Sequence, residues 1–283
     1  MRSRDGLTLR NNVLIAYYLG ETKKFKETMI RTIVERLSRE RVIKRTITVN
    51  GQAVPLYLSP DAQLKYLKLG KGAFDQDLIN IAQTYVTPSS NVWDIGANVG
   101  VFTFSAASIA TKGMVVAMEP DAWLASLLRR TARLPQHINT KIAIIPAAAS
   151  NNNSVAEFIV AARGRASNAL REVGGRSTMG GTRETQFVPT LTLDTLLLSF
   201  PAPDFIKIDI EGAELLALQG ATKLMQDIRP IFYVEVGGDV SDEILKLFSS
   251  HSYAALDEQG RVLQDKCANN TFFIPKESES LRT

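Results

Sequence analysis

The stretch NVWDIGANVGVF, residues 91–102, decides the fold of this chain. Residues 91–95 form a short apolar run of the kind that makes a buried parallel strand, and the residues from Phe102 onward are helical in character. Gly96 allows a tight turn and a close backbone approach to a ligand, and Gly100 lets the helix start close against the strand. The stretch therefore predicts a strand, a turn and a helix whose free N–H groups face a ligand.

The spacing of these glycines distinguishes two classes of ligand. It is G-x-x-x-G, so the G-x-G-x-x-G fingerprint of a dinucleotide pyrophosphate is incomplete. Asp94, at the end of the strand, would repel a pyrophosphate but would suit the ammonium and sulfonium groups of S-adenosyl-L-methionine. We expect Asp94, Gly96, Asn98 and Gly100 to bind that cofactor. A nucleotide- or nucleotide-sugar-binding Rossmann protein, or a purely structural turn capped by Asp94, is the alternative.

Two later strand ends extend this predicted cofactor site. Glu119 and Pro120 end the next strand, 23 positions after Gly96, where a carboxylate can accept hydrogen bonds from both ribose hydroxyls. Asp121 either joins them or caps the following helix. The third strand ends in small residues beginning at Ala147, which leave room for a flat adenine or simply pack closely.

Strand and helix patterns alternate beyond residue 75, which indicates βαβ units and a mainly parallel sheet. Strands are predicted at 91–95, 114–118, 142–145, 205–210 and 231–236, and helices at 77–85, 102–110, 122–134 and 214–225. Residues 253–256 and 272–274 predict a closing antiparallel pair. Glu157–Val160 and Gln186–Val188 enclose the glycines at 174, 175, 180 and 181, and we interpret this segment as an insertion close to the active site or as a hairpin tip without a function.

The N-terminal part of the chain differs in charge from the rest. Residues 1–50 contain 12 Lys or Arg and 5 Asp or Glu, whereas residues 51–283 contain 21 and 24. An apolar residue at every fourth position predicts a basic helix over 24–45, which packs on the main domain, joins a homo-oligomer or binds a membrane surface or polyanion. Asn50-Gly51 between two short strands predicts a type I′ hairpin. We therefore divide the chain into an appendage (1–70), a Rossmann-like domain (71–276) and a tail (277–283).

Composition excludes several other classes of protein. No apolar run approaches the roughly 20 residues that span a bilayer, and the single cysteine, Cys267, allows neither an intramolecular disulfide nor a zinc cluster. Both features suit a cytoplasmic protein. The body carries a negative charge, so we expect no nucleic-acid partner. Neither His137 nor His251 stands at the carboxyl end of a predicted strand. We expect both at the surface and therefore expect no histidine base.

Four runs of this chain together resemble the FkbM family of methyltransferases: residues 92–102, 117–120, 192–196 and 205–214. The most specific is 205–214, FIKIDIEGAE. The resemblance spans roughly residues 70–275 and leaves out 1–45. It implies a seven-stranded methyltransferase sheet and O-methylation of sugars or other small metabolites by S-adenosyl-L-methionine.

The end of the strand over 205–210 supplies the candidate catalytic groups. Lys207, Asp209 and Glu211 alternate, so in an extended strand they share a face, and three charges on one face need partners. We expect Asp209 to face the cofactor or the acceptor hydroxyl, Glu211 to act there or cap the next helix, and Lys207 to pair with Asp94 or another carboxylate. Glu235, at the end of the neighbouring strand, could take the hydroxyl proton. No dedicated metal-ligand spacing is present, but this carboxylate cluster leaves metal assistance open. A non-catalytic binding module with the same fold is a further alternative.

Overall fold

A computed structural model describes residues 31–68, 70–162, 164–173 and 181–278. Its centre is an eight-stranded sheet of order β13-β12-β14-β11-β10-β3-β4-β5. Neighbours from β11 to β5 are parallel, and β14 runs antiparallel between β11 and β12. The strands are β3 (Asn91–Ile95), β4 (Met114–Met118), β5 (Ile142–Ile145), β10 (Phe205–Ile208), β11 (Ile231–Glu235), β12 (Tyr253–Leu256), β13 (Val262–Leu263) and β14 (Asn270–Pro275). The mainly parallel Rossmann-like sheet is confirmed, with the two-residue β13 added at its edge.

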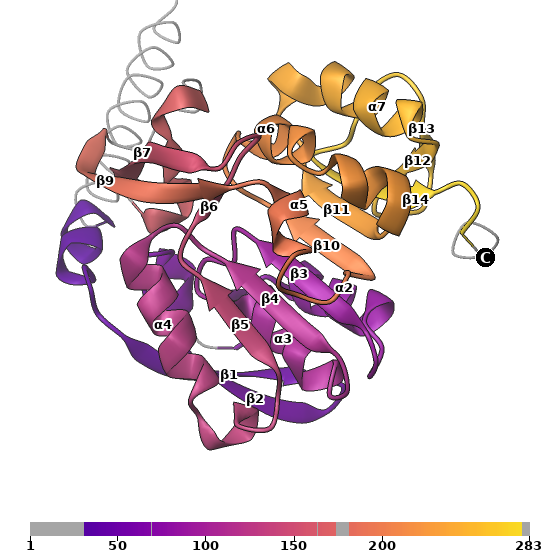
Figure 1. Cartoon of the computed structure of the whole chain (residues 1–283). Helices are drawn as coiled ribbons and strands as arrows, with labels where there is room; N and C mark the ends of the chain where they lie inside the picture. Colours follow the sequence, from indigo (N-terminus) through magenta and orange to yellow (C-terminus); the bar gives the residue numbers. More distant parts are fainter. Residues whose placement is uncertain (1–30, 69, 163, 174–180, 279–283) are drawn as a thin grey trace, which may run out of the picture.

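Helices cover both faces of this sheet (Figure 1). They are α2 (Gln76–Tyr85), α3 (Val101–Ile109), α4 (Ala122–Ala132), α5 (Leu193–Leu196), α6 (Glu214–Gln219) and α7 (Ser241–Ser250). Trp93 and Ile206 pack in the same cluster as side chains of α5, α6 and α7, whereas Val92 and Phe205 pack with α2 and α3. Side chains that alternate along each strand thus fill two apolar layers, which is the three-layer arrangement that a βαβ pattern requires.

The predicted hairpin is present before the main sheet. β1 (Ile43–Val49) pairs with β2 (Gln52–Leu58) around Asn50 and Gly51, which both have positive φ, 49° and 78°, as a type I′ turn requires. The inner side chains of the hairpin pack on α3 and α4, and the backbone N–H of Tyr57 donates to Thr131 of α4 at 2.9 Å. The hairpin is therefore part of the folded body and does not stand apart from it.

A second sheet lies beyond the end of β5 (Figure 1). Its order is β6-β9-β7-β8, formed by β6 (Ala148–Ala149), β7 (Ser154–Ala161), β8 (Ala169–Leu170) and β9 (Thr182–Leu191). A 3-10 turn, η4 (Arg165–Ser167), connects β7 with β8. This sheet is the insertion that the glycine-rich segment predicts. The glycines at 174, 175 and 180 lie outside the described residues.

Two predicted helices differ from the structure. The helix over 24–45 is helical at 31–37 within the described residues, but it ends before β1, where β-branched residues alternate. The helix over 214–225 stops at Gly220, whose added Cβ would meet Ser150 O at 2.4 Å, and a separate π-helical turn follows at Leu224–Ile228. Within the described part of the chain, no helix is long and apolar enough to cross a membrane.

Candidate active site

A cavity of about 270 Å³ lies at the carboxyl edge of the parallel sheet, where open α/β sheets bind ligands. Gly96, which directly follows the central strand β3, lines this cavity. Two groups of lining residues flank Gly96. The β4 end is formed by Asn98, Glu119, Pro120, Arg165 and Asn168, and the β11 end by Asp75, Asp77, Asp209, Glu211, Tyr233 and Glu235.

Both glycines of the turn after β3 are required by close packing. Gly96 has φ of 81°, and a Cβ there would lie 1.9 Å from the carbonyl oxygen of Asp209. Gly100 has φ of 89°, and a Cβ there would meet Leu128 and Phe104 at 2.6 Å. Gly96 also lines the cavity, whereas Gly100 lies behind it. The structure assigns Gly100 a packing role, since it lets α3 and α4 pack closely, and its ligand contact stays a prediction.

Asp94 is a buried partner of Lys207 and not part of the cavity wall. Its carboxylate is fully buried, accepts from Thr103 Oγ1 at 2.5 Å and from Lys207 Nζ at 3.1 Å. Lys207 also donates to the carbonyl oxygen of Gly96 at 2.9 Å. The ion pair predicted for Lys207 is confirmed, whereas Asp94 is not among the described residues that line the cavity, and its contact with a cofactor stays a prediction. Asp94 supports the glycine turn through Lys207.

Lys207 remains charged despite its burial. Burial alone would lower the pKa of Lys207, but the attraction of Asp94 and Asp209 outweighs it and raises that pKa above its usual range. The ammonium lies 3.5 Å from Asp209. Among the described residues, this ammonium contacts Asp94, Asp209 and the carbonyl oxygen of Gly96. One cation thus ties the end of β10 to the end of β3.

Glu119 is the most confined carboxylate of the cavity. It is 5% exposed, and its two oxygens accept from the backbone N–H of Asn98 at 2.8 Å and of Asp121 at 2.9 Å. Burial raises the pKa of Glu119 to about 8, against the lowering effect of those two backbone hydrogen bonds. Each oxygen keeps lone-pair capacity toward the cavity. The arrangement can accept two hydrogen bonds from a pair of hydroxyl groups.

Three further features surround Glu119. Asp121 caps α4 by accepting from Trp123 N and Leu124 N, which confirms the predicted cap. The side-chain oxygen of Asn98 is buried in the cavity wall and has no partner in the described residues. A small apolar recess of about 20 Å³ shares Gly96 and Pro120 with the cavity, and Ala147 lies in its wall. A flat apolar group can approach Ala147 there.

The β11 end brings together the three carboxylates proposed for catalysis. Oxygens of Asp209, Glu211 and Glu235 lie within 4.8 Å of one another. Glu211 does not reach the cavity through the expected alternation of an extended strand, because β10 ends at Ile208 and Glu211 has a φ of 54°. A turn therefore brings Glu211 into the cavity. Carboxylates at this spacing can hold a proton, an acceptor hydroxyl or a divalent cation.

Glu214 and the two histidines lie outside the cavity lining. Glu214 is fully buried, and its Oε1 accepts from Ile210 N at 3.3 Å and Gly212 N at 3.0 Å, so it holds the turn that presents Glu211. His137 is buried against Phe104 and lies 2.9 Å from Pro55 O, which makes its predicted surface position wrong. His251 bonds within the end of α7.

Several residues that line the cavity were not predicted by any pattern in the sequence. Asp75 and Asp77 come from the start of α2, and Tyr233 comes from within β11. Tyr233 donates to Glu258 at 2.9 Å, and burial together with that hydrogen bond raises its pKa, so its phenol keeps its proton. Arg165 comes from the insertion. The glycine-rich segment marked this region, but nothing in the sequence distinguished Arg165 within it.

Comparison with known proteins identifies the class of this fold and site. The Methyltransferase FkbM domain matches residues 94–255, which is more than half of the chain. The chain belongs to this family of methyltransferases.

Individual relatives are more distant. Hexuronic acid methyltransferase AglP of Haloferax volcanii is 27% identical over 179 residues, 62% of this chain and 68% of that protein. The crystal structure of methyltransferase FkbM from Methylobacillus flagellatus is 19% identical, with a TM-score of 0.41 over 66% of this chain and 44% of that one. This chain therefore matches less than half of the length of that protein. A SAM-dependent O-methyltransferase from Thermotoga maritima is 13% identical, with a TM-score of 0.41 over 83% and 79%.

Proposed function

We propose that this chain is an S-adenosyl-L-methionine-dependent O-methyltransferase that acts on a hydroxyl of a small molecule or a sugar. One observation carries the proposal. A single cavity joins the backbone-held carboxylate of Glu119 to the carboxylates of Asp209, Glu211 and Glu235, with Gly96 between the two groups. The first group suits the ribose of a nucleoside cofactor, and the second suits a proton that leaves an acceptor hydroxyl.

The residues of the β4 end fit the cofactor. Glu119 offers two acceptors to the ribose hydroxyls, and the buried oxygen of Asn98 lacks a donor among the described residues, which a ligand would supply. The apolar recess beside Pro120 and Ala147 suits the edge of an adenine. With adenine and ribose held there, Gly96 and Asp209 of the same cavity would hold the methionine part. The cofactor then supplies an activated methyl group at the β11 end.

The carboxylates of the β11 end would handle the acceptor proton. Asp209 is held by Lys207, and its side chain is 38% exposed, so it remains accessible from the cavity. Glu235 faces the same space from β11. Holding the hydroxyl in line with the methyl group supplies much of the rate, and one of these carboxylates accepts the proton. Tyr233 would orient the acceptor, since its protonated phenol cannot act as the base.

A sugar is the favoured acceptor class. The relative from Haloferax volcanii is named as a hexuronic acid methyltransferase, and a polar, carboxylate-lined cavity provides hydrogen-bond acceptors for vicinal hydroxyls. The deciding experiment is transfer of labelled methyl from S-adenosyl-L-methionine to a panel of sugars and metabolite alcohols. Label in an alkali-stable methyl ether supports the proposal. Label in an ester, an amine or a nucleobase contradicts the hydroxyl assignment.

A binding measurement tests the cofactor separately from the acceptor. S-adenosylhomocysteine should raise the melting temperature, because a ligand that binds the folded state stabilises it. NADH and a nucleoside diphosphate sugar serve as comparison ligands for the alternative Rossmann functions. A shift with either of those and none with S-adenosylhomocysteine would contradict the proposed cofactor.

A further inference from the structure

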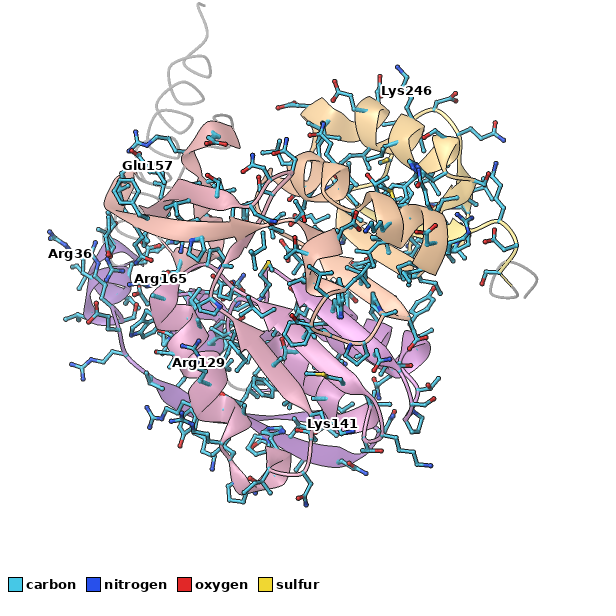
Figure 2. All side chains as sticks on the ribbon, viewed as in Figure 1. Arg36, Arg129, Lys141, Glu157, Arg165 and Lys246 are labelled. Atoms are coloured by element: carbon cyan, nitrogen blue, oxygen red, sulfur yellow. The ribbon has the colours of Figure 1, made fainter. Side chains whose placement is uncertain are left out.

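Arg165 lies at the junction of three segments that are far apart in the sequence. It belongs to η4 in the insertion, and its side chain is 4% exposed. Its Nε pairs with Asp61 at 3.1 Å and its Nη1 with Asp121 at 2.5 Å. The guanidinium also lies 5.0 Å from the ring centre of Trp123. In Figure 2 it is labelled between the sheet of β7 and β9 and helix α4.

Backbone bonds fix the turn that carries this guanidinium. Arg165 N donates to Asp61 O at 2.9 Å. Within the same turn, Asn168 Nδ2 donates to Asp121 at 2.9 Å, and Asn168 Oδ1 accepts from Ala161 N at 2.8 Å. The insertion is thus anchored both to the loop after β4 and to the segment after the hairpin. Arg165 and Asn168 both line the cavity.

Asp121 connects Arg165 to Glu119. One carboxylate oxygen of Asp121 caps α4, and the other receives Arg165 and Asn168. The backbone N–H of Asp121 donates to Glu119 at 2.9 Å. The geometry of Glu119 therefore depends on the loop that Arg165 holds. Two acidic side chains so close in a buried site also need a nearby cation, because like charges disfavour each other's ionisation.

Among the described residues, Arg165 is the cation that pairs with Asp121. Lys207 faces Glu119 from β10, but it is engaged by Asp94 of β3 and by Asp209. Asp121 lies in the loop of Glu119 itself and opposes its ionisation. On the insertion side, the guanidinium of Arg165 meets Asp121 directly.

We propose that Arg165 is a positioning residue for the cofactor, which makes the insertion part of the cofactor site. By pairing with Asp121 and fixing its loop, Arg165 holds the carboxylate of Glu119 in the place that two ribose hydroxyls require. The inference rests on the proposed use of S-adenosyl-L-methionine and adds a residue from the insertion to it.

The test measures the Kd of S-adenosylhomocysteine between pH 6 and 9 by calorimetry. Arg165→Met should weaken binding about 10-fold at pH 7 and move the pH profile upward by about one unit, because the uncompensated Asp121 then opposes ionisation of Glu119. Arg165→Met combined with Asp121→Asn removes both charges, keeps a capping side chain, and should restore most of the affinity. Arg183→Met is the matched control, since Arg183 of β9 also pairs with Asp61 but does not line the cavity.

The outcomes separate a positioning role from a structural one. Wild-type affinity in Arg165→Met, or an equal loss at every pH that Asp121→Asn does not restore, overturns the inference. Should Arg165→Met fail to fold, Asp121→Asn alone decides, because its pH profile should move downward once the negative neighbour is gone; an unchanged profile overturns the inference. A wild-type protein that binds no S-adenosylhomocysteine at any pH overturns the proposed cofactor as well.

Discussion

The acidic groups at the two ends of the cavity differ in their burial and in their hydrogen bonding. At the β4 end, Glu119 is 5% exposed and both of its oxygens are held by backbone N–H groups. At the β11 end, the side chain of Asp209 is 38% exposed, and Glu211 and Glu235 are half-buried. Backbone hydrogen bonds therefore fix the carboxylate at the β4 end, whereas the carboxylates at the β11 end are partly accessible to solvent. The contrast fits the proposed roles, in which Glu119 recognises a fixed ligand and the β11 carboxylates exchange protons.

The cost of burial explains why the difference is informative. A buried carboxylate is destabilised unless hydrogen bonds or a cation compensate it. Glu119 has backbone donors on both oxygens, yet its pKa remains raised to about 8, so a ligand that donates two hydrogen bonds would complete its environment. At the β11 end, Lys207 lies 3.5 Å from Asp209, and Asp209 also lines the cavity. Charge changes during a reaction are therefore tolerated more easily at the β11 end.

The largest effect is expected from removing the proton acceptor at the β11 end. Glu235→Gln and Asp209→Asn keep the shape of each side chain, and at least one of them should lower kcat by about 10²–10⁴-fold, the usual range for loss of a general base. KM should change less, because the group acts mainly in the transition state. Asp209→Asn should also disturb cofactor binding, since Asp209 touches Lys207. The measurement is steady-state kinetics on an acceptor found by the labelled-methyl panel.

The exposed Glu243 of α7 provides the control, because Glu243→Gln changes the same charge far from the cavity. If both cavity variants turn over as fast as Glu243→Gln, neither carboxylate is the base. Positioning alone would then account for the rate, and the proposed contrast between the two ends would lose its chemical meaning.

The second effect concerns stability at the point where the two ends meet. Lys207→Met leaves the fully buried Asp94 without its cation, and removing one partner of a buried pair costs about 3–5 kcal/mol. Urea unfolding should show this loss, and Lys207→Met with Asp94→Asn should recover part of it. Lys246→Met, on the exposed side of α7 (Figure 2), should change the unfolding free energy little. Equal stability in Lys207→Met and wild type would show that the pair does not support the glycine turn.

The third effect is a pH dependence at the β4 end. Because burial raises the pKa of Glu119 to about 8, the stability that its protonated form contributes is present below its ordinary pKa of 4.5 and is lost as the pH rises through 8. Hydroxyl donors prefer the carboxylate form, so affinity for S-adenosylhomocysteine should increase from pH 6 to about 8 and then level off. Glu119→Gln should weaken binding and flatten this rise. Parallel pH profiles in calorimetry of the two proteins would show that Glu119 does not bind the ribose.

Local patterns predicted most of the frame of this molecule. The limits of β3, β4, β5 and β12 agree with the predicted strands, because each is a short apolar run bounded by turn residues. The cap at Asp121 and the turn at Asn50 were readable because one residue type strongly prefers each position.

The site was less predictable, because it depends on contacts between distant segments. Asp94 stands where a ligand contact was expected, but the side chain of Lys207, 113 positions away, takes its carboxylate. Glu211 reaches the cavity through a left-handed turn and not through strand alternation. Arg165 joins the site because the insertion folds back on the loop after β4. No local periodicity in the sequence predicts such contacts between distant segments.

The smallest effect is expected at the N-terminus, and it tests whether cofactor recognition is confined to the body. Among the described residues, the cavity lining begins at Gln63, and the basic segment before it contacts the insertion through Glu40, 3.5 Å from Arg183. A truncation that removes residues 1–30 keeps this contact and the hairpin, whereas a cut at 45 would remove the first residues of β1. We expect the shortened protein to bind S-adenosylhomocysteine with a Kd within about twofold of wild type, since every residue predicted to bind the cofactor lies beyond residue 90. Sedimentation and acceptor kinetics should instead reveal any change, in oligomeric state or in KM for the acceptor. A truncated protein that keeps its fold by circular dichroism but loses cofactor affinity would show that the basic segment belongs to the β4 end, and the boundary between appendage and domain would then have to move toward the N-terminus.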